Sequence, residues 1–295
     1  MTQDKPKKIN YLNNKDILKE IHKSKLTYCY SEDTEKFNNY DVIVDSAEDI
    51  FSNIQTAKNN KAAKMQSESY ASAMLTYDST NYRNKPKQKD FLVDPNSLDT
   101  YELVFRVMTF DHIPEELDRK KTHKTISDSK AKIHFPPFKH FVITDLENKK
   151  IREVVRSHWQ GSLSNGKFSI DHGRITNKLG TMFLKLVERY SHRANWRGYT
   201  YVDEMRGQAL VQLSYMGLQF NEAKSDNPFA YYTAAVNNSF TRVLNLEKRS
   251  QNIKDDILIE QGHLPSYSRQ LKHEEEVRNV RKEAADIEGN NEPAV

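Results

Sequence analysis

The sequence lacks the features that stabilise secreted and membrane proteins. Cys29 is the only cysteine among 295 residues, so no disulfide can form within the chain, which favours a reducing compartment. No apolar run approaches the roughly 20 residues that a transmembrane helix needs. The opening MTQDKPKK also lacks the apolar segment of a secretory signal. We therefore expect a soluble, cytoplasmic protein without a membrane partner.

The common marks of an enzyme are missing as well. The chain shows no nucleophile motif, no glycine-rich phosphate loop, no paired catalytic carboxylates and no internal repeat. Four histidines have neither a nearby cysteine nor a close ligand partner: His112, His123, His134 and His140. We interpret them as solvated or core side chains and not as metal ligands. We expect no catalysis, no metal and no cofactor. A nucleic-acid enzyme with its active site within about residues 27–170 stays an alternative.

Apolar residues are scarce and charge is unevenly distributed. The apolar fraction is 37%, against a usual value of roughly 45–50%. The net charge of +4 is mild, but bases outnumber acids seven to three in residues 1–25 and again in residues 174–206. Acids outnumber bases seven to four in residues 271–295. A basic body with an acidic tail suits a protein that meets a polyanion on one side.

Changes in composition and periodicity divide the chain into four parts, at residues 1–26, 27–173, 174–258 and 259–295. The first part predicts a short amphipathic helix over residues 9–25, capped by Asn14. The second is polar, with two strand-like stretches interrupted by Pro136 and Pro137, and predicts a large α+β or partly irregular insertion. The fourth predicts an acidic, flexible tail.

The third part, residues 174–258, predicts a compact unit of three helices. Apolar residues recur mainly at steps of three and four from Ile175 to Tyr190 and from Val202 to Met216, which indicates two amphipathic helices. A third helix begins with Asn227 as its cap and Pro228 in the first position, where the missing N–H costs nothing. The fold class is therefore mainly α.

The third helix has two different faces. An apolar stripe at steps of three and four is typical of core packing: Phe229, Tyr232, Val236, Phe240 and Val243. Polar and aromatic residues with a basic end lie elsewhere: Tyr231, Asn237, Asn238, Arg242, Lys248 and Arg249. Basic side chains neutralise phosphates, asparagine can pair with an adenine edge, and an exposed tyrosine can stack on an unpaired base. A solvated helix face with an ordinary basic C-terminus is the alternative.

Two stretches of this part resemble a known family. The order of features in DEMRGQALVQLSYMGLQF and NPFAYYTAAVNNSFTRVLNLEKR is similar to the second conserved region of bacterial RNA polymerase sigma factors, in particular the late-transcription sigma factors of T-even-type tailed phages. GYT at 198–200 and NYLNNKDILKEI near the N-terminus also fit. The matching positions are Asp203, Glu204, Met205, Phe220, Asn227, Pro228, Ala230, Tyr231, Thr233, Ala235, Asn238, Phe240, Glu247, Lys248 and Arg249. The resemblance covers about residues 9–25 and 174–255.

The resemblance implies a late sigma factor acting in the cytoplasm of an infected bacterium. In this family the second helix docks on the coiled coil of the largest polymerase subunit. The positions implied for this contact are Asp203, Glu204 and Gln208, beside an apolar face that includes Met205. The third helix reads a TATA-like promoter element just upstream of the start site and holds the melted strand. The positions implied for DNA binding are Tyr231, Tyr232, Thr233, Asn237, Asn238, Arg242, Lys248 and Arg249.

The sequence departs from the family at several places. Primary sigma factors carry a tryptophan pair where Ala234 and Ala235 stand, so a wedge at the edge of melted DNA would be weaker or come from Trp196 or another residue. No helix-turn-helix resembling the reader of the distant upstream element is found. Phage late factors use a co-activator and the DNA sliding clamp, but the ending EGNNEPAV lacks an aromatic residue or leucine for the clamp. A non-catalytic adaptor that binds another protein through the three helices is the alternative.

Overall fold

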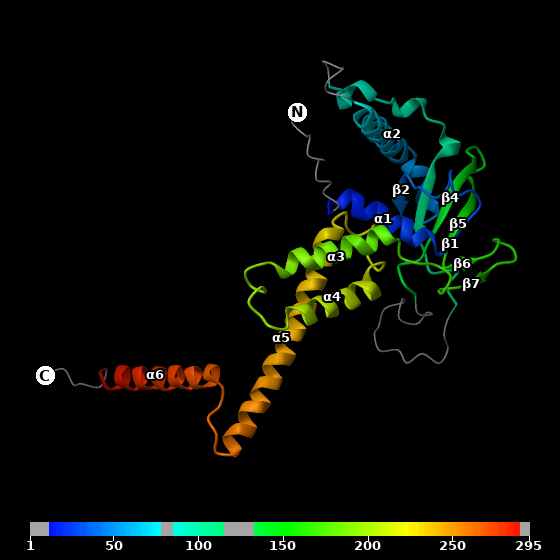
Figure 1. The fold of residues 1–295 in the computed structure, drawn as a ribbon. Coiled ribbons are helices and arrows are strands. Elements are labelled where there is room, and N and C mark those ends of the chain that lie inside the picture. The colour runs from blue at the N-terminus through cyan, green and yellow to red at the C-terminus, as the bar shows by residue number, and fades with distance from the viewer. Residues whose placement is uncertain (1–11, 78–84, 115–132, 290–295) are drawn as a thin grey trace, which may run out of the picture.

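A computed structural model describes residues 12–77, 85–114 and 133–289 (Figure 1). About 53% of the structure is helical, which confirms the expected mainly helical fold. Four helices pack together and form what we call the helical unit: α1 (Asn14–Leu26), α3 (Asn177–Ser191), α4 (Val202–Met216) and α5 (Pro228–Glu260). Two more helices lie outside it: α2 (Ile54–Thr76) and α6 (Tyr267–Gly289).

The sequence between α1 and α3 folds around a mixed sheet, which we call the sheet unit. Its strands are β1 (Cys29–Ser31), β2 (Val42–Val44), β3 (Val104–Met108), β4 (Phe138–Asp145) and β5 (Lys150–Ser157). The spatial order is β1-β5-β4-β3-β2, with β2 parallel to β3 and the other pairs antiparallel. A small hairpin of β6 (Trp159–Gln160) and β7 (Lys167–Phe168) follows. Four short 3₁₀ helices complete the unit: Glu48–Asn53, Gln88–Phe91, Pro95–Ser97 and Thr100–Glu102.

The two faces of the sheet belong to two different cores. On β3, Val104 joins a core shared with α1, α3, α4 and α5, whereas the next residue, Phe105, joins a core built on Ile50 and Ala57. This alternation follows from the period of two in a strand. The sheet unit is therefore not an independent appendage, because one of its faces completes the core of the helical unit.

The N-cap residues of α5 and α1 lie at or within one residue of the predicted positions. The side chain of Asn227 accepts a hydrogen bond from the backbone N–H of Ala230 at 3.1 Å, and Pro228 opens α5, as expected. The cap of α1 is Asn13, one residue before the expected Asn14. Side-chain caps of this kind satisfy backbone N–H groups that have no partner inside the helix.

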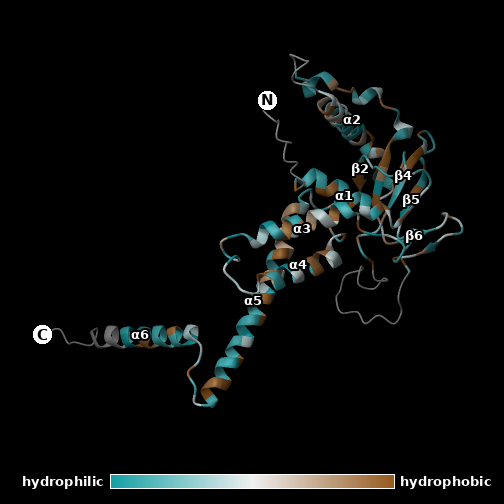
Figure 2. Cartoon of the chain, in the orientation of Figure 1, coloured by the Kyte–Doolittle hydropathy of each residue, from teal (hydrophilic) through white to brown (hydrophobic). Residues whose placement is uncertain are grey.

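The C-terminal part differs from the flexible tail that the sequence predicts. α5 continues to Glu260, and α6 projects from its end, away from the body (Figure 1). Asp255 holds the corner by accepting hydrogen bonds from the backbone N–H and the hydroxyl of Ser266, at 2.8 and 2.7 Å. Figure 2 shows that α6 is largely hydrophilic, so its sequence carries no core-facing stripe that would have revealed the helix. In the part of the chain that the structure describes, no helix is long and apolar enough to cross a membrane.

Candidate nucleic-acid interface

The apolar stripe of α5 packs into the core, as predicted. Tyr232, Val236, Phe240 and Val243 are buried and Phe229 is half-buried. The Phe240 ring meets both Tyr190 and Trp196 edge-on, with each pair of ring centroids 5.4 Å apart. This packing fixes which sides of α5 remain available to a ligand.

Tyr231 lies at the edge of this packing. One part of its ring meets Phe220 edge-on, with centroids 5.5 Å apart, and the side chain is half-buried. Partial burial raises the pKa of the Tyr231 phenol, so the group is neutral at neutral pH. A ring supported on one side and partly exposed is suited to stacking on a base.

Two residues named from the family resemblance are not accessible. Tyr232 is 1% exposed, and its hydroxyl donates a hydrogen bond to the backbone carbonyl of Gly217. Met205 is 0% exposed, because it lies on the side of α4 that faces the core. The structure therefore corrects both positions: neither side chain can touch DNA or polymerase in this conformation.

The basic residues of α5 that were predicted to bind DNA are exposed. Arg242, Lys248 and Arg249 form no ion pair within the described residues. A hollow of about 460 Å³ is lined by Asn238, Thr241, Arg242, Asn245, Leu246 and Arg249. All of these residues come from one helix, so the hollow is an open helix face and not an enclosed cavity. Such a face can bind an extended polyanion better than a small molecule.

A second, smaller hollow lies on the other flank of α5, next to α3. It measures about 200 Å³ and its lining includes Arg189, Arg193, Phe229 and Thr233. The Thr233 hydroxyl has no hydrogen-bond partner within the described residues. The predicted DNA-binding residues thus divide between two flanks of α5. Neither arginine stands out in the sequence as a neighbour of α5, because Arg189 lies in α3 and Arg193 lies in the turn just after it.

Asn237 points to this second flank. Its Oδ1 accepts a hydrogen bond from the Tyr190 hydroxyl at 2.6 Å, while the residue itself stays exposed. The Arg193 guanidinium lies 4.3 Å from the centre of the Tyr190 ring. Tyr190 therefore links the amide and the cation, whereas Asn238 lies on the first flank with Arg242.

The exposed side of α4 extends beyond the predicted contact residues. Asp203, Glu204 and Gln208 are exposed, and Asp203 pairs with Arg206 at 2.9 Å. The same side continues with two exposed apolar side chains, Val211 at 51% and Tyr215 at 73%. Glu204, Gln208, Val211 and Tyr215 follow one another at steps of four, three and four, so they form one stripe. A stripe of this spacing is suited to packing against another helix.

Trp196 does not offer the wedge that the missing tryptophan pair would require. It is 8% exposed and packs on Phe240. Ala235 is also buried, and Ala234 presents only a methyl group to solvent. Any wedge at the edge of melted DNA would therefore need a different residue.

The histidines considered as metal ligands fall into different environments. His140 is fully buried and bonds to Arg106, and burial lowers its pKa well below the usual value. Burial also lowers the pKa of His112 to about 4, and His112 bonds to the Ser157 carbonyl at 3.0 Å. His134 is half-buried and His123 lies outside the described residues. Within the described ranges, no group of three or more metal-binding side chains is arranged to hold an ion.

Comparison with protein-family models, curated proteins and solved structures gave no match.

Proposed function

We propose that this chain is a sigma-type initiation factor for phage late transcription. It would bind bacterial core RNA polymerase through α4 and recognise and melt a TATA-like promoter element with α5, in the cytoplasm of the infected cell. One observation carries the proposal. Along one flank of α5, outside the core stripe, a supported aromatic ring (Tyr231), an amide (Asn238) and two cations without an ion pair among the described residues (Arg242 and Arg249) follow one another.

These side chains suit a single strand of DNA next to a duplex. The guanidinium groups can neutralise phosphates, the amide can bond to a base edge, and the ring can stack on an unpaired base. Extruding a base costs a few kcal/mol, and stacking on an aromatic ring recovers about 1–3 kcal/mol per base. The hollow beside α3 supports the same proposal, because its space of about 200 Å³ is surrounded by cations and by the Thr233 hydroxyl, which has no hydrogen-bond partner in the part of the chain that the structure describes.

The stripe on α4 supports a protein partner. Val211 and Tyr215 expose apolar surface in line with Glu204 and Gln208, and interfaces are enriched in tyrosine. We propose the coiled coil of the largest polymerase subunit as this partner, from the family resemblance. A late co-activator and the sliding clamp are further partners that the resemblance implies. The same stripe would also serve a non-catalytic adaptor, which is the second candidate function.

Transcription in a purified system separates the two candidates. The chain would be added to bacterial core polymerase with supercoiled or pre-melted DNA that carries a TATA-rich element, and core polymerase alone serves as the control. We expect transcripts that start at a fixed position downstream of the element. Binding to polymerase without specific initiation on either template would favour the adaptor.

Substitutions on the two helices should separate docking from promoter opening. Tyr231→Ala and Asn238→Ala should impair opening and leave polymerase binding intact, because they lie on α5 outside the α4 stripe. Asp203→Lys combined with Glu204→Lys should abolish polymerase binding through charge reversal. Unchanged binding in that double variant would exclude α4 as the docking helix.

A further inference from the structure

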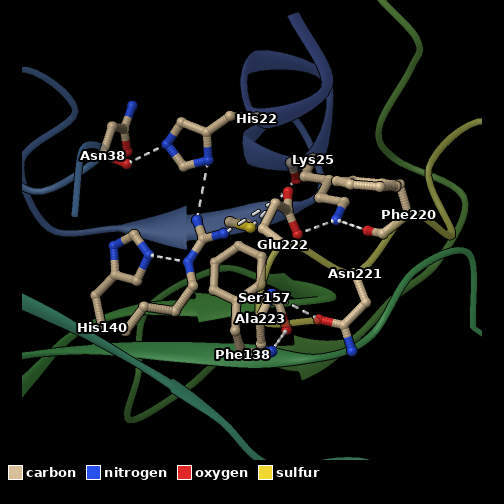
Figure 3. A network of polar contacts seen from close by, with 12 residues as sticks. His22, Lys25, Asn38, Phe138, His140, Ser157, Phe220, Asn221, Glu222 and Ala223 are labelled. Carbon is tan, nitrogen blue, oxygen red and sulfur yellow. Dashed lines mark hydrogen bonds and ion pairs between the residues drawn. The ribbon is translucent and has the colours of Figure 1, made fainter. Parts of the chain in front are cut away.

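A buried polar cluster joins the sheet unit to the connection between α4 and α5. Its members come from three distant parts of the sequence: Lys25 of α1, Arg106 of β3 and Glu222 of the α4–α5 connection. Figure 3 shows Lys25 bonded to both Glu222 and Phe220, with His22 and His140 nearby. Lys25 and Arg106 are 0% exposed. Burying a charge is unfavourable unless a partner compensates for the lost contacts with water. The stability of this cluster therefore depends on how closely its charged groups face one another.

Lys25 fixes the backbone of the connection directly. Its Nζ donates to the Glu222 Oε2 at 2.6 Å and to the Phe220 carbonyl oxygen at 2.6 Å. Burial lowers the pKa of Lys25 to about 8, while the Glu222 carboxylate opposes this shift. The ammonium group therefore needs Glu222 in order to remain charged where it is.

Arg106 brings the sheet unit into this arrangement. Its guanidinium lies between the rings of Tyr40 and Phe138, 3.9 and 3.8 Å from their centres. Its Nη1 faces the Glu222 Oε1 at 3.9 Å, and neither atom has a hydrogen-bond partner within the described residues. The sheet thus places a rigidly held positive charge opposite the carboxylate that holds Lys25.

The connection in turn supports Tyr231. Phe220 is 3% exposed, so its ring is held in the core, and that ring meets Tyr231 edge-on at 5.5 Å. A continuous series of contacts runs from Arg106 through Glu222 and Lys25 to Phe220 and then to Tyr231.

We propose that Lys25 and Glu222 are positioning residues that hold the Phe220 ring edge-on against Tyr231, and that Arg106 makes this positioning depend on the sheet unit. This rests on the proposed use of Tyr231 as a stacking platform. The sheet unit then has a role in promoter opening without touching DNA, because it fixes the support of the stacking ring.

The test combines a mutant cycle with a label on the ring. The full chain would be titrated with a TATA-type single strand that carries 2-aminopurine, whose fluorescence is quenched by stacking. Tyr231→Ala should weaken binding roughly 5- to 150-fold, the range expected for one stacked base. Glu222→Gln should weaken binding by about 2-fold or more and reduce quenching, but should have no further effect in the Tyr231→Ala background.

Two companion variants separate positioning from general damage to the fold. Phe220→Leu removes the supporting ring and leaves the polar cluster in place, so it should reproduce the effect of Glu222→Gln. Lys224→Gln changes an exposed residue of the same connection and should have no effect. Additive effects of Glu222→Gln and Tyr231→Ala would overturn the proposal, since a merely structural residue weakens binding independently of the ring.

A measurement without DNA keeps the two proposals apart. In protein labelled with fluorotyrosine, the Tyr231 resonance, assigned by its loss in Tyr231→Phe, should shift or broaden in Glu222→Gln. An unchanged resonance would overturn the positioning role. If the wild-type chain bound no single strand, the proposed function would fail, and the fluorine resonance alone would decide whether the ring is positioned.

Discussion

The adjacent residues Tyr231 and Tyr232 of α5 have opposite environments. One is therefore available for binding, whereas the other contributes to the stability of the fold. Tyr231 keeps part of its ring exposed, whereas Tyr232 is buried against Phe183, with ring centroids 4.9 Å apart. In a helix, neighbouring residues point about 100° apart, so consecutive tyrosines cannot share one face. Only the first of the pair is placed to meet a ligand.

Conservative substitutions should reveal this difference. Tyr232→Phe removes the hydroxyl that donates to the Gly217 carbonyl, and leaving that acceptor unpaired should lower the free energy of unfolding by about 1–3 kcal/mol. DNA affinity should not change while the variant is folded. Tyr231→Phe keeps the ring and should change neither quantity. Denaturant unfolding and single-strand titration measure the two effects, and a loss of DNA affinity in folded Tyr232→Phe would contradict the assignment.

Residue roles were predictable from sequence where periodicity decides them. The spacing of α5 placed Phe240 and Val243 in the core correctly, and the same spacing already counted Tyr232 with them. The family resemblance alone suggested Tyr232 and Met205 as contacts, and burial overrules it for both. The cluster of Lys25, Arg106 and Glu222 had no local signal, because its members are far apart in sequence and meet only in the fold.

At the scale of elements, α4 contains a glycine that no contact within the described ranges requires. A Cβ added at Gly207 would meet no atom within 4 Å, and the residue is exposed in a helix interior. Glycine in such a position costs roughly 0.5–1 kcal/mol relative to alanine. Gly207 adjoins the stripe that contains Gln208 and Val211. A partner helix that approaches this stripe closely would explain why the cost is tolerated.

Gly207→Ala should therefore stabilise the protein by roughly 0.5–1 kcal/mol and still weaken polymerase binding. Gly180→Ala in α3 is the matched control, because its added Cβ also meets no atom within 4 Å. It should stabilise to a similar extent without changing polymerase binding. Thermal unfolding and an affinity measurement with core polymerase give both quantities. Equal polymerase affinity for the two variants would exclude a close approach at Gly207.

Elements with a strong apolar pattern or a clear cap were predicted, and elements without one were not. The three helices between Asn177 and Glu260 follow their stripes and the Asn227 cap. α2 was missed because only Ala57 and Ala62 are buried along its 23 residues. β5, KIREVVRS, alternates charged and apolar residues too irregularly to stand out, since the charged pair Arg152 and Glu153 interrupts the alternation.

At the scale of the whole molecule, the sheet and helical units share one core, so we expect them to unfold together. Two histidines with lowered pKa values, the buried His158 and the half-buried His112, lie in the sheet unit close to this shared core. Burial lowers the pKa of His112 to about 4 and that of His158 to about 3. Protonation of these histidines in acid should therefore lower the free energy of unfolding of the whole molecule.

The direction of this effect follows from the proton balance. Both folded-state pKa values lie below the value of about 6.5 in an unfolded chain, so the unfolded state binds more protons between about pH 6.5 and pH 4. The stability from these histidines is fully present above about pH 6.5 and is lost as the pH falls toward 4. Each can contribute a slope of up to about 1.36 kcal/mol per pH unit.

His158→Asn should reduce the dependence of the free energy of unfolding on pH. The reduction should reach up to about 1.36 kcal/mol per pH unit, which corresponds to one proton. Asparagine cannot titrate, and it tolerates the left-handed backbone of this residue, whose φ is 53°. Denaturant unfolding at several pH values between about 7 and 5 gives the slope for each variant. His192→Asn, a change at an exposed histidine, is the control. A His158→Asn slope equal to that of the wild type would show that His158 binds the same number of protons in the folded and unfolded states over this pH range. Acid sensitivity would then have to originate in other groups whose pKa changes on folding, with His112 of the sheet unit as the next candidate.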